Sequence, residues 1–220
     1  MSIKAVIFDM DGTILDTEPI WKDITIELLN SYGIYEEIDQ SVLDSLTGIG
    51  ISNSAVLLKN RFGIRDTVDN IVERKMDISD NFLSEKPIEF IKGFEMFHSC
   101  LQSSGIVTAV GTNASFKTVD LMKQRLNLNC WFNDHIYSIG DVGNKAKPDP
   151  AVFLYAANKL NVRPDECIVF EDSVHGFKAA KSAGMRCVAI RNRSNIDQLD
   201  LVDESVYDYS LAFDVVQRWI

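Results

Sequence analysis

Two acidic residues, Asp9 and Asp11, follow a short apolar run near the start of this 220-residue sequence. In an extended backbone residues i and i+2 point the same way, so both should present oxygens to one small volume. Two carboxylates this close repel each other, and a hard divalent cation, or a proton kept by one of them, relieves the repulsion. The pair therefore predicts a metal or acid–base site, although an isolated D-x-D is more often two solvated loop acids.

The elements that must position these acids are buried strands. Four apolar runs lie at residues 5–8, 106–110, 167–170 and 187–190, and each is followed by polar or small residues and then a helix-like pattern. This alternation predicts an α/β fold with a doubly wound, mostly parallel sheet. Ligands of such sheets bind beyond the carboxyl ends of the strands, so we expect Asp9, Thr112 and Asp172 to converge there.

A helical insertion interrupts this rhythm after the first strand. Between residues 17 and 85 the strand signal disappears, and apolar residues recur at helical spacing, for example at Ile20, Ile24 and Leu28. We predict a catalytic core of residues 1–16 and 88–220 and an all-helical cap of residues 17–87. Because the cap begins close to Asp9, it should lie above the same strand ends and act as a lid.

The segment Asp9-Met10-Asp11-Gly12-Thr13, directly after a buried strand, resembles the D-x-D-G-T signature of the haloacid dehalogenase-like (HAD) hydrolase superfamily. Three more motifs of that superfamily have counterparts in the expected order. They are a threonine after a strand, a lysine before a proline, and an acidic pair ending a strand, here Thr112, Lys147 and Glu171-Asp172. The resemblance covers nearly the whole chain and implies a Rossmann-like core.

The resemblance also implies roles for the acids. Asp9 would be the nucleophile that becomes an aspartyl-phosphate, and Asp11 would protonate the leaving group and then deprotonate the attacking water. Mg²⁺ would be held by a carboxylate oxygen of Asp9, the backbone carbonyl of Asp11 and the side chain of Asp172. Glu171 would be a direct or a water-mediated ligand.

The remaining motif residues would bind the transferred phosphoryl group. The resemblance gives this role to Thr112, to backbone amides near Asn113, and to Lys147, whose charge would also offset the clustered acids. To act as an acid near neutral pH, Asp11 needs a raised pKa, and the neighbouring carboxylates and an excluding cap both push its pKa upward.

The start of the insertion, Asp16-Thr17-Glu18-Pro19 followed by Trp21, is similar to that of the β-phosphoglucomutase and sugar-phosphatase branch. Mutases of this branch carry a cap histidine where Trp21 stands, and no histidine precedes His98. The prediction is therefore an Mg²⁺-dependent phosphatase of a small phosphorylated metabolite, in particular a sugar phosphate. A phosphosugar mutase of the β-phosphoglucomutase type is the alternative.

Two other classes are weaker alternatives. A dehalogenase shares the nucleophilic aspartate but does not need Asp11. A non-enzymatic phosphoacceptor signalling domain also gathers aspartates, threonine and lysine, but its phosphoacceptor and acidic pair lie on different strands, and a helical lid suits turnover better.

Two residues have ambiguous positions. Trp21 is predicted to pack within the cap rather than to face substrate, and His175 is predicted to be a solvated loop residue rather than part of the site. The segment 48–53 contains no basic residue, so the sequence does not identify contacts to the distal part of a substrate.

Composition and charge limit the kinds of partner that the protein is expected to bind. The formal net charge is -10 with no basic run, which disfavours nucleic acid, and no stretch approaches the roughly 20 apolar residues of a membrane span. The expectation is a cytoplasmic protein acting on a small-molecule phosphate ester, as a monomer or weak homodimer.

Overall fold

The computed structural model describes residues 2–220, in which six strands form one parallel sheet. The strands run in the order β3-β2-β1-β4-β5-β6. Their bounds are β1 Ala5–Phe8, β2 Val107–Thr112, β3 Ile136–Ser138, β4 Cys167–Glu171, β5 Arg186–Ile190 and β6 Glu204–Val206. The predicted doubly wound fold is confirmed. The sequence pattern missed β3 and β6, which have three residues each and are too short to show a period.

Alternate residues of the strands face two separate cores. Val6 and Phe8 of β1 pack with one group of helices, and Ala5 and Ile7 pack with the other. The first group is α5 (Phe94–Ser103), α6 (Phe116–Leu126), α7 (Asn129–Phe132) and α10 (Ala212–Val216); the second is α8 (Ala151–Lys159) and α9 (Val174–Ser182). The sheet is thus covered on both faces, as parallel sheets require, and the continuous apolar runs of the sequence follow from this double burial.

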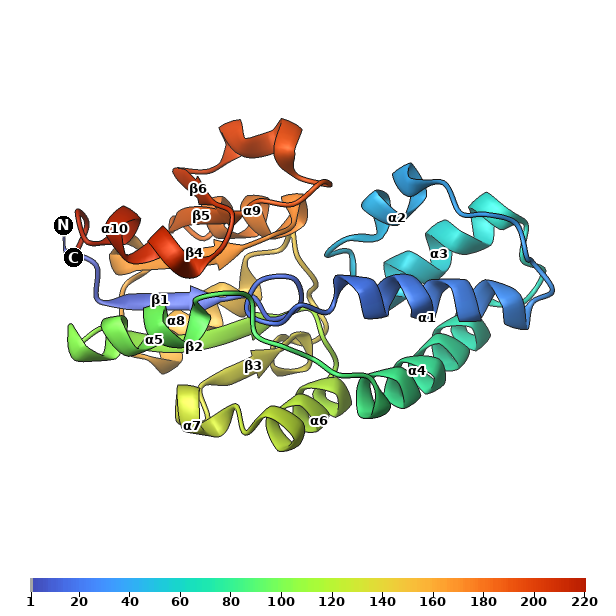
Figure 1. Ribbon diagram of the computed structural model, residues 1–220, viewed down its shortest axis with the longest axis horizontal. Helices are drawn as coiled ribbons and strands as arrows, with labels where there is room; N and C mark the ends of the chain where they lie inside the picture. Colours follow the sequence, from blue (N-terminus) through green and yellow to red (C-terminus); the bar gives the residue numbers. More distant parts are fainter. Residues whose placement is uncertain (1) are drawn as a thin grey trace.

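Short 3₁₀ helices fill several connections, at Ile139–Val142, Pro164–Glu166, Ile196–Leu201 and Tyr209–Leu211. The two chain ends lie together beside the amino end of β1 (Figure 1), where Ile3 N donates a hydrogen bond to Trp219 O at 2.8 Å. Among residues 2–220, the structure contains no helix with the length and apolar character needed to cross a membrane.

Four helices follow β1 and lie beyond the carboxyl ends of the strands (Figure 1). They are α1 (Glu18–Ser31), α2 (Gln40–Leu46), α3 (Gly50–Phe62) and α4 (Val68–Glu85), and they share a small core of their own that includes Leu28, Leu58 and Ile71. The helical character predicted for this segment is correct, while α2 was not foreseen from its single buried residue, Val42.

The two chain crossings between these helices and the rest of the molecule run side by side. Asp16 N donates to Glu89 O, and Ile91 N donates to Ile14 O, both at 2.9 Å. A pair of adjacent crossings is what a hinged lid needs, because the lid can then move about one line. The predicted division at residues 17 and 87 stays a prediction, and these contacts agree with it.

Candidate active site

The predicted site residues come together at the carboxyl ends of β1 and β4, where the order of the strands along the sheet reverses. Strands β1 and β4 are neighbours, and the chain winds outward from them to opposite edges, which makes their carboxyl ends the crevice where ligands bind in this topology. Asp9 directly follows β1, and Glu171 ends β4. One cavity of about 130 Å³ is lined by all the residues predicted for the site, namely Asp9, Asp11, Thr112, Asn113, Lys147, Glu171 and Asp172.

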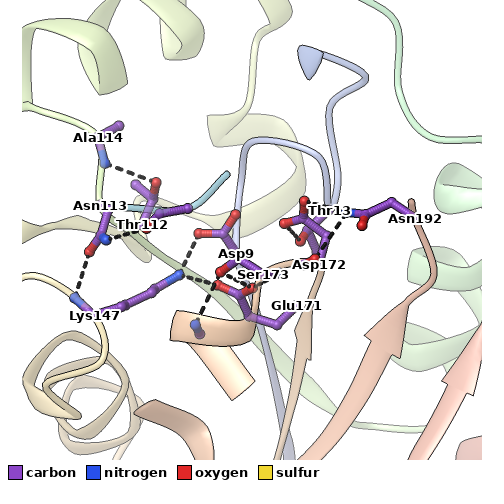
Figure 2. Close-up of polar contacts among 12 residues, drawn as sticks. Asp9, Thr13, Thr112, Asn113, Ala114, Lys147, Glu171, Asp172, Ser173 and Asn192 are labelled. Carbon is purple, nitrogen blue, oxygen red and sulfur yellow. Dashed lines mark hydrogen bonds and ion pairs between the residues drawn. The ribbon is translucent and has the colours of Figure 1, made fainter. Parts of the chain in front are cut away.

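Lys147 links the acids of the two central strands (Figure 2). Its Nζ atom lies 2.5 Å from Oδ1 of Asp9 and 2.7 Å from Oε1 of Glu171, and its side chain is 1% exposed. Burial alone would lower the pKa of Lys147, but the charges of Asp9 and Glu171 outweigh burial and raise it. The lysine is therefore held as a buried cation beside Asp9.

Glu171 uses its second carboxylate oxygen to anchor the next helix. Its Oε2 atom accepts hydrogen bonds from the backbone N of Ser173 at 2.6 Å and from Ser173 Oγ at 2.9 Å. Ser173 in turn caps α9, since its Oγ accepts from Gly176 N at 3.0 Å. A Cβ atom on Gly176 would lie 1.8 Å from Cδ of Glu171, so only glycine fits there. Both oxygens of Glu171 are thus engaged by protein donors.

Asp11 is held from the helical insertion. Its Oδ1 atom accepts from Thr17 Oγ1 at 2.8 Å and from Trp21 Nε1 at 3.0 Å. Burial raises the pKa of Asp11, although the donors Trp21 and Thr17 and the charge of Lys147 act to lower it. The packing role predicted for Trp21 is incomplete, because the indole packs against the core and also donates to Asp11 and lines the cavity.

The acids outnumber the cations in this part of the site. Burial, followed by the charges of neighbouring acids, raises the pKa of Asp172 well above its ordinary value, and burial likewise raises the pKa of Asp9. Within residues 2–220, no three His, Cys, Asp or Glu side chains are grouped to hold a metal by themselves. The predicted set instead combines two carboxylates, Asp9 and Asp172, with the backbone carbonyl of Asp11. These are hard oxygen donors in a group where acids outnumber cations, and the donor set fits Mg²⁺.

Thr112 ends β2, on the other side of Asp9, and Asn113 directly follows it. Thr112 Oγ1 accepts from Ala114 N at 3.1 Å, which leaves the hydroxyl hydrogen free to be donated. The Asn113 side chain makes two hydrogen bonds that the sequence did not indicate. Its Oδ1 accepts from Lys147 N at 2.9 Å, and its Nδ2 donates to Gly48 O at 2.9 Å. Asn113 therefore connects the segment between α2 and α3 to the loop that carries Lys147.

Sequence reasoning missed a second lysine in the cavity. Lys75, on α4, is 3% exposed and donates from Nζ to Ser54 Oγ of α3 at 2.8 Å. Burial lowers its pKa to about 8. The cavity thus has a cation on the insertion side, where the segment 48–53 offered none. No sequence signal marks Lys75, because a lysine on an amphipathic helix is ordinarily exposed.

His175 does not behave as predicted. It lies in the first turn of α9 rather than in a loop and is half-buried, and burial, followed by the charge of Lys178, lowers its pKa. The prediction of a solvated loop residue is therefore wrong in its structural part. His175 is not among the residues that line the cavity.

A doubly wound sheet that presents acids, a hydroxyl and a buried lysine at the carboxyl ends of its central strands is the arrangement of an α/β enzyme. More particularly, the chain belongs to the haloacid dehalogenase-like hydrolase family, whose family model matches residues 6–190. The resemblance drawn from the motifs is confirmed, and so is the prediction of a hydrolytic enzyme.

Individual relatives are similar over most of their length. The chain is 31% identical over 192 residues to a phosphorylated carbohydrates phosphatase of Thermotoga maritima, covering 83% of this chain and 82% of the relative. It is 30% identical over 219 residues to the mitochondrial (DL)-glycerol-3-phosphatase 1 of Arabidopsis thaliana, covering 94% and 72%. The crystal structure of β-phosphoglucomutase from Clostridium difficile superposes with a TM-score of 0.82 at 26% identity, covering 98% of this chain and 96% of that one. These similarities agree with the predicted branch of the family.

Proposed function

We propose that this protein is an Mg²⁺-dependent phosphatase that hydrolyses a small phosphorylated metabolite, a sugar phosphate in class, through an aspartyl-phosphate at Asp9. The observation that carries the proposal is the contact of Lys147 with Asp9 Oδ1, in a cavity that also holds the separately anchored acid Asp11. Phosphoryl transfer needs an oxygen nucleophile, neutralisation of the phosphoryl oxygens and a proton donor. These residues supply all three.

In the first half-reaction, a carboxylate oxygen of Asp9 attacks phosphorus. The bond from phosphorus to Asp9 forms while the bond to the leaving oxygen breaks, and Asp11 gives its proton to that oxygen. Lys147 holds Oδ1 of Asp9 and so leaves Oδ2 for the attack. The hydroxyl of Thr112 donates to a phosphoryl oxygen. Because Thr17 and Trp21 both donate to Oδ1 of Asp11, its proton resides on Oδ2.

In the second half-reaction, the carboxylate of Asp11 takes a proton from a water molecule, whose oxygen attacks phosphorus. The bond between phosphorus and Asp9 breaks, inorganic phosphate leaves, and Asp9 and Asp11 return to their starting states. Asp11 thus acts first as an acid and then as a base.

The residues that would hold Mg²⁺ are Asp9 and Asp172, through their carboxylates, and Asp11, through its backbone carbonyl. When bound, the ion would neutralise charge on the phosphoryl oxygens. Glu171 contacts Lys147 through Oε1 and Ser173 through Oε2, and the proposal gives it the role of holding Lys147 in place.

The insertion would bind the leaving group as a cap, residues 17–87. Lys75 and Ser54 face the cavity from α4 and α3, and a buried ammonium beside a hydroxyl suits an alcohol-rich group. The names of the two phosphatase relatives support this class of substrate. A mutase is the second candidate, supported by the likeness to β-phosphoglucomutase. Trp21 disfavours it, since an indole N–H only donates and cannot relay a proton.

The test is a phosphate-release screen with Mg²⁺ over sugar phosphates, glycerol phosphates and nucleotides. Asp9→Asn should lower kcat by at least about 1,000-fold, as loss of a nucleophile does, while Asp16→Asn, the same change at an exposed neighbouring acid, should leave it unchanged. Activity that survives Asp9→Asn would exclude the covalent intermediate. Formation of an isomerised sugar phosphate without release of phosphate would favour the mutase.

A further inference from the structure

The carboxylate of Asp172 is held on both of its oxygens by residues without an assigned role. Thr13 Oγ1 donates to Oδ1 at 3.1 Å, and Asn192 Nδ2 donates to Oδ2 at 3.2 Å. Figure 2 shows Asn192 reaching Asp172 from the side of the site away from Lys147. The same Nδ2 also donates to the backbone O of Asp172 at 3.0 Å. Asn192 therefore contacts Asp172 at both its side chain and its main chain.

Asn192 is itself fixed by the turn after β5. Its Oδ1 atom accepts from Ser194 N at 2.9 Å, from Ser194 Oγ at 2.8 Å and from Asn195 N at 3.1 Å. These three donors settle which end of the amide is oxygen, and so point its NH₂ group at Asp172. Asn195, which is fully buried, adds a hydrogen bond from Nδ2 to the backbone O of Asp172 at 2.7 Å. The turn thus presents a rigid donor to the acid.

The space around Asp172 is equally constrained. A Cβ atom on Gly12 would lie 2.3 Å from Oδ2 of Asp172, so the carboxylate occupies the volume that any other residue at position 12 would fill. Each oxygen of Asp172 accepts one hydrogen bond from these donors and keeps lone-pair capacity for another partner. A carboxylate fixed in this way is oriented before any ligand arrives, which removes the cost of orienting it on binding.

We propose that Asn192, with Thr13, is a positioning residue that sets the affinity of the protein for Mg²⁺ by fixing the carboxylate plane of Asp172. The inference rests on the proposed function in taking Asp172 as a metal ligand. Partners that orient metal ligands from outside the coordination sphere typically change metal affinity about 10- to 100-fold when removed. Neither residue touches the phosphoryl group or the leaving group in this scheme, so their effect should appear in metal binding.

The experiment is calorimetric titration of the whole protein with MgCl₂ in the absence of substrate. Asn192→Ala should raise the Kd for Mg²⁺ about 10-fold or more. Ser194→Ala is the matched control: it loosens the same turn by removing one hydrogen bond to Asn192 but leaves the donor to Asp172, and its Kd should stay within about twofold of the unchanged protein. The melting temperature without Mg²⁺, measured for each variant, separates loss of stability from loss of metal affinity.

Thr13→Val provides a second variant in case Asn192→Ala does not fold. Valine has nearly the shape of threonine and removes only the donor to Oδ1 of Asp172, far from the turn after β5. It should also weaken Mg²⁺ binding several-fold. If both variants bind Mg²⁺ as tightly as the unchanged protein, the positioning role is excluded while the proposed function stands. If the unchanged protein takes up no Mg²⁺, the metal part of the proposed function falls together with this inference.

Discussion

Replacing Lys75 by methionine should make the protein more stable and less active at once. The ammonium of Lys75 is buried, with Ser54 Oγ as its hydrogen-bond acceptor and no acid within ion-pair distance among residues 2–220. Methionine has a similar length and needs no solvation. The variant therefore removes the cost of burying a charge while it keeps most of the packing of α4 against α3.

The expected gain in the free energy of unfolding follows from the pKa of Lys75, which burial lowers from 10.5 to about 8. At pH 7, holding the proton costs about 3 kcal/mol, because each tenfold change in proton affinity corresponds to about 1.4 kcal/mol. Loss of the hydrogen bond to Ser54 offsets about 1 kcal/mol. Lys75→Met should thus gain about 2 kcal/mol at pH 7, which corresponds to a melting temperature about 4–8 °C higher in a chain of this length.

The sign of the pH dependence is a sharper test. Between pH 8 and pH 10.5 the unfolded chain binds more protons at Lys75 than the folded protein does, so the free energy of unfolding of the unchanged protein rises with pH relative to the variant. The advantage of the variant should therefore be full below pH 8, reach zero at about pH 9.5, and become a deficit of about 1 kcal/mol, from the lost hydrogen bond, by about pH 10.5.

Chemical denaturation at pH 7, 9 and 10 measures this gap, and phosphate release on the best substrate of the screen measures activity. The value of kcat/KM should fall at least about 10-fold, since a charge-assisted hydrogen bond to the leaving group is lost. Lys178→Met, at an exposed position of α9, serves as the control and should change neither quantity. A destabilised Lys75→Met variant, or a stability gap that does not depend on pH, would refute the reasoning.

Two further predictions concern single contacts. Trp21→Phe keeps the aromatic packing but removes the donor to Asp11, so kcat should fall roughly 10-fold with little change in KM, as measured by initial rates of phosphate release; a kcat within twofold would show that Thr17 alone suffices. His98, fully buried with a pKa lowered by burial from 6.5 to about 4, must stay neutral in the folded protein. Relative to His98→Phe, the unchanged protein should lose about 3 kcal/mol of free energy of unfolding as pH falls from 6.5 to 4. Denaturant titration at several pH values measures this loss. If the free energy of unfolding depends on pH in the same way for both proteins, the prediction is wrong.

Some strands of the sheet can be predicted from local sequence, and others form only through pairing with their neighbours. The run at residues 5–8 is β1 as expected, because burial on both faces of a sheet leaves a continuous apolar signature in the sequence. The three-residue strands β3 and β6 leave none, and pairing with longer neighbours forms them. Local pattern thus predicts an element only when the element is long enough to show its period.

The convergence of Asp9, Thr112 and Asp172 was foreseen from the strand ends, and the family resemblance added Lys147 to them. Parallel strands end at a common edge, so residues that follow them meet whatever the loops do. Which donors hold these acids was not foreseen. Asn192 and Asn113 contact residues that are 20 and 65 positions away along the chain. Trp21 contacts Asp11, which is 10 positions away, and no local pattern indicates this hydrogen bond.

By itself, then, the sequence determined the α/β architecture, the helical insertion and the order of the four motifs, because periodicity and strand ends are local properties of a chain. Only the tertiary structure shows that Lys75 lines the cavity and that Glu171 accepts hydrogen bonds from Lys147 and Ser173. It also shows that the turn after β5 donates a hydrogen bond to Asp172. These depend on how helices and loops pack against one another, and no short stretch of residues encodes that packing.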